Sequence, residues 1–289
     1  MDAITVPLRI EASSASWPEL LRHIEGPPEA LWVRGRLSIL ARTPRVAVVG
    51  TRAPTPYGEA QAARFAGALA RAGVTVVSGL ARGVDHAAHR AALDEGGATV
   101  AVLGCGVDRP WPSGELAKDM AARGLLLSEF QPGEPPRPHH FPLRNRVISG
   151  LCCGILVVEA AQASGSLITA RWAADQGRSV WALPGRVDHP MSRGAHRLIR
   201  EGASLVESPE EILAEIGLEL APQRSNVAVP ETSEPDRGIV DALRGETLTA
   251  EELSRRLSRA LTTVLVQVVE LEMAGRVART PGGLYRLVR

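Results

Sequence analysis

Short runs of β-branched and other apolar residues alternate with longer amphipathic stretches between residues 46 and 217. The short runs have the length and composition of strands buried on both faces, and they lie at residues 46–49, 75–77, 99–103, 125–127, 155–158, 180–183 and 204–206. Between the first two runs, residues 58–72 place Ala62, Phe65, Ala66 and Leu69 on one helix face. The alternation predicts an α/β fold with an open, doubly wound, mostly parallel sheet.

The segments on either side of this region have different patterns. Residues 1–45 read as an entry segment, with a short helix at 17–21 and an edge strand at 31–33. Residues 218–235 lack periodicity and are rich in linker residues, which predicts a flexible tether. Residues 236–289 hold helices at 238–243, 250–257 and 261–273 and a hairpin of 277–279 with 284–288. This order of helices and hairpin predicts a small winged-helix domain.

Composition narrows the class of protein. The chain has 289 residues and a net charge of +1, so any phosphate site must be a local cluster of basic groups. No apolar stretch approaches the roughly 18 residues of a membrane helix, and no secretory signal is visible, so we expect a cytoplasmic protein. Cys105, Cys152 and Cys153 lack metal-ligand spacing and are interpreted as reduced thiols. We expect neither a metal nor a cofactor.

Glycine-rich loops follow three of the predicted strands, at the edge where open parallel sheets bind ligands. The loops contain Gly50, Thr51 and Arg52 after the first strand, Gly79, Arg82 and Gly83 after the second, and Ser164, Gly165, Ser166 and Thr169 after the fifth. Glycine allows backbone N–H groups to approach an anion, and a helix start offers unpaired donors. Each loop alone is also explained by a tight turn, but three at one edge favour a phosphate site.

The segment 137–146 combines three arginines with one phenylalanine. Its candidate residues are Arg137, Phe141, Arg144, Asn145 and Arg146. Such a combination suits backbone phosphates together with one stacked base. The alternative is that Phe141 belongs to the core and the arginines form a solvated face.

Two common nucleotide motifs are absent. A dinucleotide fingerprint needs G-x-G-x-x-G after the first strand, and the loop beginning at Gly50 lacks the second glycine. Gly104-Cys105-Gly106 follows a later strand, but Arg109 stands where the third glycine belongs. The only lysine, Lys118, does not follow a P-loop pattern.

Taken together, these motifs resemble the DNA-processing protein A family (DprA, also called Smf) over residues 17–207. The resemblance implies an extended Rossmann-like domain, homodimerisation, binding of single-stranded DNA, and loading of the RecA recombinase onto DNA coated by single-strand-binding protein, in natural transformation (competence) or recombination. By position, Gly50, Thr51, Arg52, Ser164, Gly165 and Ser166 would form a phosphate pocket, with Arg137, Phe141, Arg144 and Arg146 along the DNA path. Thr51 and His196 depart from the Ser and Asn that family members often carry, and the helical domain that begins many relatives is missing or reduced.

The alternative is a nucleotide-cleaving enzyme of the lysine-decarboxylase-like (LOG) type. Its P-G-G-x-G-T-x-x-E signature is not present, because Pro184-Gly185-Arg186 lacks the second glycine. Asp85, His86, His89 and Glu159 would form an acid–base set only if the fold brought them together. We therefore expect a binding protein and not an enzyme.

The helix expected at 261–273 is poorly equipped to read DNA. It carries Glu270 and Glu272 and has no basic residue before Arg276, although Arg255, Arg256 and Arg259 precede it. Acidic side chains repel phosphates. We expect the tail to act as a protein-contact or regulatory module.

Overall fold

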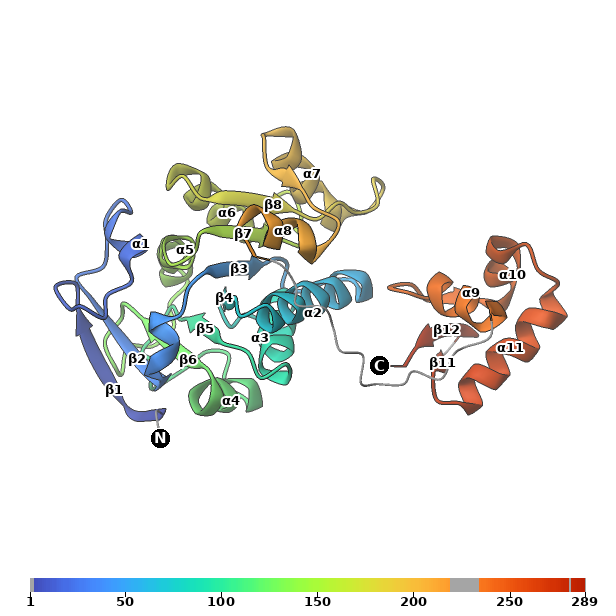
Figure 1. Ribbon diagram of the computed structural model, residues 1–289, viewed down its shortest axis with the longest axis horizontal. Coiled ribbons are helices and arrows are strands. Elements are labelled where there is room, and N and C mark those ends of the chain that lie inside the picture. Colours follow the sequence, from blue (N-terminus) through green and yellow to red (C-terminus); the bar gives the residue numbers. More distant parts are fainter. Residues whose placement is uncertain (1–2, 219–233, 281, 289) are drawn as a thin grey trace. The chain divides into compact units, whose positions relative to one another are not determined.

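A computed structural model describes residues 3–218, 234–280 and 282–288 (Figure 1). The chain divides into two compact units, Met1–Ala221 and Pro222–Arg289. The predicted tether at 218–235 lies outside the described residues except at its ends. Each unit is described by itself.

The larger unit is built on one nine-stranded sheet with the order β1-β2-β6-β5-β4-β3-β7-β8-β9. The strands from β6 to β9 in this order run parallel, and β2 and β1 are added antiparallel at one side. The strands are β1 (Ala3–Glu11), β2 (Ala30–Arg36), β3 (Arg45–Val49), β4 (Thr75–Ser78), β5 (Thr99–Val102), β6 (Leu125–Ser128), β7 (Gly154–Val157), β8 (Ser179–Ala182) and β9 (Ser204–Leu205). The predicted fold class is confirmed.

The beginning of the chain differs from the prediction. The strand expected at the sheet edge, β2, is internal, because β1 pairs with its outer side. In β2, Leu31 and Val33 are buried in alternation with half-buried residues, the pattern of an antiparallel strand with one covered face. In β1, Val6 is 72% exposed. Apolar and polar residues alternate only weakly along this strand, so the sequence pattern did not predict it. Residues 1–45 thus extend the sheet itself.

Helices cover both faces of this sheet (Figure 1). α2, α3 and α8 supply apolar side chains to one face, and α1, α5 and α6 supply them to the other. The helices of the unit are α1 (Glu19–Arg22), α2 (Pro56–Arg71), α3 (Val84–Asp94), α4 (Glu115–Arg123), α5 (His140–Gly150), α6 (Ser166–Asp175), α7 (Arg193–Arg200) and α8 (Pro209–Glu215), with 3-10 turns at Leu37–Ala41 and Pro190–Ser192.

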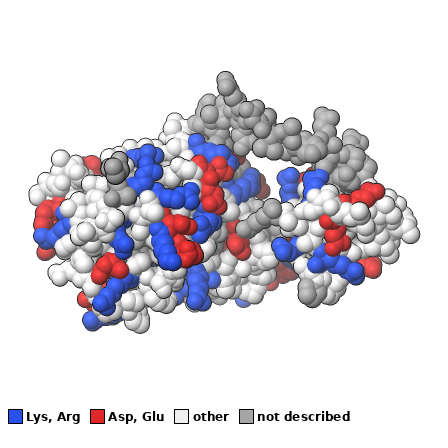
Figure 2. Space-filling model, turned by 90° about the horizontal axis from the view of Figure 1, so that it is seen from below, with Lys and Arg blue, Asp and Glu red and all other residues white. Residues whose placement is uncertain are grey.

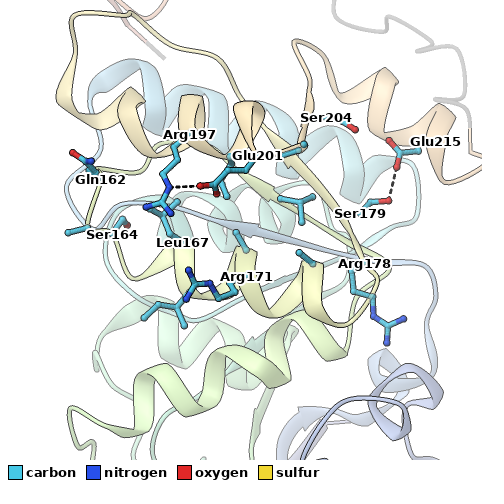
Figure 3. A pocket seen from close by; sticks show the side chains of 18 residues that line it. Gln162, Ser164, Leu167, Arg171, Arg178, Ser179, Arg197, Glu201, Ser204 and Glu215 are labelled. Atoms are coloured by element: carbon cyan, nitrogen blue, oxygen red, sulfur yellow. Dashed lines mark hydrogen bonds and ion pairs between the residues drawn. The ribbon is translucent and has the colours of Figure 1, made fainter.

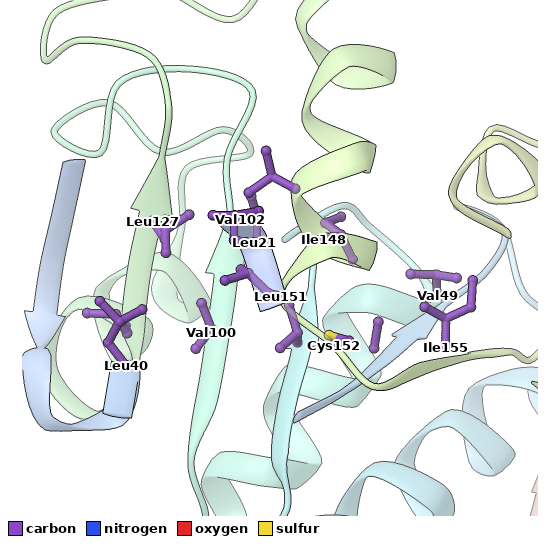
Figure 4. Close-up of a cluster of buried hydrophobic side chains, with 14 of the residues drawn as sticks. Leu21, Leu40, Val49, Val100, Val102, Leu127, Ile148, Leu151, Cys152 and Ile155 are labelled. Carbon is purple, nitrogen blue, oxygen red and sulfur yellow. The ribbon is translucent and has the colours of Figure 1, made fainter. Parts of the chain in front are cut away.

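One of the two main cores fixes α5 against the sheet (Figure 4). Ile148 on α5 and Leu151 at its end pack with side chains from the strands, among them Val49, Val102 and Ile155. All five are buried. Because α5 is anchored at this end, its opposite end, which begins at His140, has a fixed position above the carboxyl ends of the strands.

The smaller unit has the predicted winged-helix order. Its elements are α9 (Glu234–Ala242), β10 (Leu248–Thr249), α10 (Ala250–Leu257), α11 (Leu261–Met273), β11 (Val277–Thr280) and β12 (Leu284–Leu287). The three strands form a sheet in the order β10-β12-β11. Its separate core contains Leu253, Val264, Val268 and Tyr285. In the described residues of both units, every helix is too short or too polar to cross a membrane.

Candidate nucleic-acid interface

A hollow of about 590 Å³ opens where the strand order changes direction, between β3 and β7. The loops after β3, β4 and β7 and the start of α5 surround it, as expected for a ligand site of an open α/β sheet. The predicted site residues that line it are Gly50, Arg52, Phe141, Arg144, Asn145, Ser164, Gly165, Ser166 and Thr169. Thr51, Gly79, Arg82, Gly83, Arg137 and Arg146 do not line it.

The loop after β3 is tightly joined to its neighbours. The Thr51 amide donates to the Glu159 carbonyl at 2.7 Å, and the Val84 amide donates to the Thr51 carbonyl at 3.2 Å. Gly83 has φ +80°, and a Cβ there would lie 2.5 Å from the Thr51 oxygen. Gly83 therefore permits this close approach. The Thr51 hydroxyl accepts from the Ala53 amide at 3.2 Å, so it stabilises the loop.

Arg52 and Phe141 lie next to each other at the hollow. The Arg52 guanidinium carbon is 5.6 Å from the centre of the Phe141 ring. Arg52 is exposed, and no carboxylate of the described residues pairs with it. Phe141 is half-buried against Gly104, where a Cβ would lie 3.0 Å from the ring. A free cation beside an accessible aromatic face suits one nucleotide, with phosphate and base bound side by side.

The start of α6 faces the same hollow. The Ser166 amide at this helix start donates to the Ser164 hydroxyl at 3.4 Å, and the Leu167 and Ile168 amides donate to the carbonyls of Ser164 and Gly165 at 3.1 Å. Among the described residues, the Gly165 amide has no hydrogen-bond partner, so it is the donor here that an anion could use. The hydroxyls of Ser164 and Ser166 lie 2.8 Å apart, and Asn145 donates from its amide nitrogen to the Gly165 carbonyl at 3.4 Å. Asn145 thereby joins α5 to the start of α6. Asn145 was predicted to bind the DNA phosphates, and the structure places it in the lining of the hollow.

Arg144, which was predicted to lie along the DNA path, lines the hollow with a buried side chain. Its guanidinium donates to the Gly79 carbonyl at 2.8 Å and also to the Val102 carbonyl. The Asp85 carboxylate nearby accepts from the Gly79 amide at 3.1 Å and the Ala81 amide at 3.3 Å. Burial lowers the pKa of Arg144 to about 10, which leaves it charged at neutral pH. Burial also raises the pKa of Asp85, and the Arg144 cation opposes that shift.

The remaining predicted arginines lie outside the lining of the hollow. Arg146 forms an ion pair with Glu129, and the two side chains are only 15% and 16% exposed. Burial raises the pKa of Glu129. Arg137 is exposed and pairs with Glu134 at 3.1 Å, and Arg82 is exposed outside the lining. Of the four arginines at 82, 137, 144 and 146, only Arg144 lines the hollow. Its guanidinium is buried.

The acid–base set of the alternative hypothesis does not converge. Glu159 accepts from the amide and the hydroxyl of Thr55 at 2.9 and 2.6 Å, so it holds the start of α2. His89 is fully buried, its Nδ1 is 2.7 Å from the Thr99 hydroxyl, and burial lowers its pKa to about 3. Within the described ranges, no cluster of three or more metal-ligating side chains exists. Glu159 therefore stabilises the segment at Thr55 that begins α2. Its position after a predicted strand did not indicate this role.

A second hollow, of about 730 Å³, lies among α6, α7, β8 and β9 (Figure 3). Two of its carboxylates accept hydrogen bonds from neighbouring side chains. Arg197 donates to Glu201 at 2.7 Å, and the Ser179 hydroxyl donates to Glu215 at 2.6 Å. The exposed Arg171 also lines this hollow. Ser164 belongs to the lining of both.

Charge elsewhere does not point to a broad basic surface. On the face drawn in Figure 2, basic and acidic side chains are interspersed. This agrees with the net charge of +1. A phosphate-binding site on this face would have to depend on individual basic side chains.

Comparisons with known proteins identify the family of each unit. The family described as DNA recombination-mediator protein A matches residues 9–217, and the DprA winged helix domain matches residues 223–283. Protein Smf of Escherichia coli is 42% identical over 97% of this chain and 77% of its own length. The crystal structure of DNA processing protein A from Streptococcus pneumoniae has a TM-score of 0.69 at 43% identity, covering 72% of this chain and 74% of that one.

A second solved structure is that of the Helicobacter pylori protein, described in terms of its single-stranded DNA binding mode. Its TM-score is 0.67 at 28% identity, and the match covers 75% of this chain and 98% of that one.

Proposed function

The chain belongs to the DNA recombination-mediator protein A family, and we propose that it binds single-stranded DNA at the hollow between β3 and β7. The observation that carries the proposal is the pair Arg52 and Phe141, a free cation 5.6 Å from an accessible ring. The start of α6 lies across the same hollow. These groups supply phosphate contacts and one stacking surface without base-specific donors.

In the proposed complex, one phosphate lies against the backbone amide of Gly165 and against the Arg52 guanidinium. The attached base stacks on Phe141. Arg144, Asn145 and Glu159 contact no DNA and fix the loops that do. The Helicobacter pylori relative, described as binding single-stranded DNA, shares the fold and supports this assignment.

A filter-binding experiment with labelled oligonucleotides tests the proposal. We expect a single strand to bind more tightly than a blunt duplex of the same length, because the ring of Phe141 requires an unpaired base. Equal affinity for both would contradict the proposal.

We propose further that the DNA-bound protein loads RecA onto DNA coated by single-strand-binding protein, in the cytoplasm, during recombination or natural transformation. Membership of the family supports this role. The test is the rate at which RecA displaces single-strand-binding protein from a circular single strand. Wild-type protein should accelerate that exchange, and Arg52→Ala should not.

We propose a homodimer that forms through the face containing α6 and the edge strand β9. Leu205 on β9 and Ile168 on α6 are 46% and 40% exposed there, and β9 has one free edge. Light scattering should give about twice the mass of 30.7 kDa. Leu205→Asp should reduce it to that of one chain, whereas Val6→Asp on the opposite edge strand β1 should not. A monomeric wild type would contradict the proposal.

We propose that the site carries out no reaction of its own. The internal partners of Glu159 and His89 support this, since neither side chain is available as a general acid or base. Incubation with nucleoside monophosphates should release no free base. Release that Glu159→Gln abolishes would favour the cleaving enzyme.

A further inference from the structure

A second aromatic side chain lies beside the proposed base-stacking surface. Trp111, in the loop between β5 and α4, has its ring centroid 5.8 Å from that of Phe141, with 46° between the planes. It is 48% exposed, whereas Trp17 and Trp181 are buried. Phe141 therefore contacts Arg52 and Trp111, and the three side chains form one accessible group next to the hollow.

The loop that carries Trp111 is held by internal hydrogen bonds. The Cys105 thiol donates to the Arg109 carbonyl at 3.2 Å, and the Gly106 amide donates to the Glu134 carbonyl at 2.9 Å. The Asp108 carboxylate accepts from the Gly133 amide at 2.8 and 3.0 Å. These contacts fix the loop before any ligand arrives, so little conformational entropy remains to be lost on binding.

The arrangement of the two rings favours an unpaired strand. Successive bases in a duplex are about 3.4 Å apart along each strand. The two ring planes are inclined by 46°, so bases stacked on them are also inclined to each other and do not keep the parallel stack of a duplex. A single strand can be extended to fit.

We propose that Trp111 is a second base-stacking surface, so that the site holds two successive unpaired bases, one on Phe141 and the next on Trp111. The inference rests on the proposed binding of single-stranded DNA and adds a subsite to it. Arg109, exposed in the same loop, lies close in sequence to supply a phosphate contact for the second nucleotide. Stacking of this kind accepts any base.

The first test compares Trp111→Ala and Trp111→Phe on two ligands, an oligothymidine and the same oligonucleotide with abasic positions. Trp111→Ala should bind the oligothymidine at least about fivefold more weakly, the lower limit for one stacked base. Trp111→Phe should keep most of the affinity. Both should bind the abasic strand as wild type does, because phosphates remain and bases do not.

Three outcomes separate the hypotheses. If Trp111→Ala binds oligothymidine as wild type does while Arg52→Ala and Phe141→Ala are weakened, the second subsite is wrong and the proposed function stands. An equal loss on the abasic strand would mean that Trp111 only supports the loop, which also overturns the inference. If wild type binds single and double strands alike, the proposed function itself fails.

Fluorescence gives a second test that does not depend on the alanine variant folding. Oligothymidine should quench wild-type tryptophan emission, the abasic strand should not, and Trp111→Phe should abolish the quenching. Trp32→Phe is the control, since Trp32 lies half-buried on β2. Quenching that persists in Trp111→Phe would contradict the proposal.

Discussion

Arg144 donates a hydrogen bond of 2.8 Å to the carbonyl of Gly79, and a Cβ at residue 79 would lie 2.6 Å from its guanidinium. The glycine and the arginine therefore depend on each other: only a residue without a side chain leaves room for the buried cation. The Arg144 cation in turn satisfies a carbonyl of the loop after β4 and interacts electrostatically with the Asp85 carboxylate.

This contact predicts that Arg144→Ala acts mainly on folding. The substitution leaves the buried Asp85 without its cation and removes the donor to Gly79, so we expect a loss of about 3–5 kcal/mol in the free energy of unfolding. Arg82→Ala, at an exposed position on the neighbouring loop, should change it by no more than about 0.5 kcal/mol. Urea denaturation measures both. If Arg144→Ala is as stable as wild type but binds DNA more weakly, Arg144 contacts the DNA and the structural interpretation is wrong.

Phe141→Ala should affect DNA binding more than folding. Because the ring is half-buried at the edge of the hollow, we expect a loss of roughly 1–3 kcal/mol in affinity, the contribution of one stacked base. Phe65→Ala provides the comparison, since Phe65 is fully buried and its removal should cost about 3–5 kcal/mol of stability. If Phe141→Ala shows the stability loss of Phe65→Ala, the ring belongs to the core.

Stability should fall in acid because of His89. Its pKa in the folded protein is about 3, below the usual 6.5, since burial disfavours the charged ring. The unfolded chain therefore binds one more proton between these values, so the contribution of His89 is complete above pH 6.5 and is lost as the pH falls toward 3. The slope from this residue is at most about 1.4 kcal/mol per pH unit.

The matched variant is His89→Gln, which can still donate to the Thr99 hydroxyl but does not titrate. Unfolding free energies measured between pH 7 and pH 4 should depend less steeply on pH in the variant. An identical pH dependence would show that His89 does not titrate between the folded and unfolded states in this range.

The winged-helix unit should contribute little to DNA affinity. α11 presents the exposed apolar side chains Val266, Val269 and Met273, and Glu270 and Glu272 are exposed on the same helix. A truncated chain ending at residue 221 retains the complete larger unit and should bind an oligonucleotide within a few-fold of the full chain. A hundredfold loss, about 2.7 kcal/mol, would place the tail in the DNA site.

The sequence predicted the parallel strands, the order of the winged-helix elements and the edge of the sheet that carries the site. Buried parallel strands are almost continuously apolar, and turn glycines mark where they end, so both signals are local. β1 was missed because Val6 and Leu8 are exposed and interrupted by proline, which gives no clear alternation.

The roles of individual arginines could not be predicted, because they depend on contacts between distant segments. Arg144 and Arg146 are two positions apart on α5, yet one donates to the carbonyls of Gly79 and Val102 and the other pairs with Glu129. Trp111 was not predicted for a similar reason: it lies beside Phe141 only because the fold brings its loop next to the start of α5, about thirty residues further along the chain. Its position after Gly104-Cys105-Gly106, at the carboxyl end of a strand, was the available signal.

The most direct test of the central claim is the salt dependence of single-strand binding for wild type and Arg52→Ala. Arg52 is the exposed, unpaired cation beside Phe141, so the variant should bind every sequence more weakly and lower the slope of log affinity against log salt by about the equivalent of one phosphate. Arg82→Ala should leave the slope unchanged. An Arg52→Ala protein with wild-type affinity and slope would show that the strand does not cross the hollow between β3 and β7.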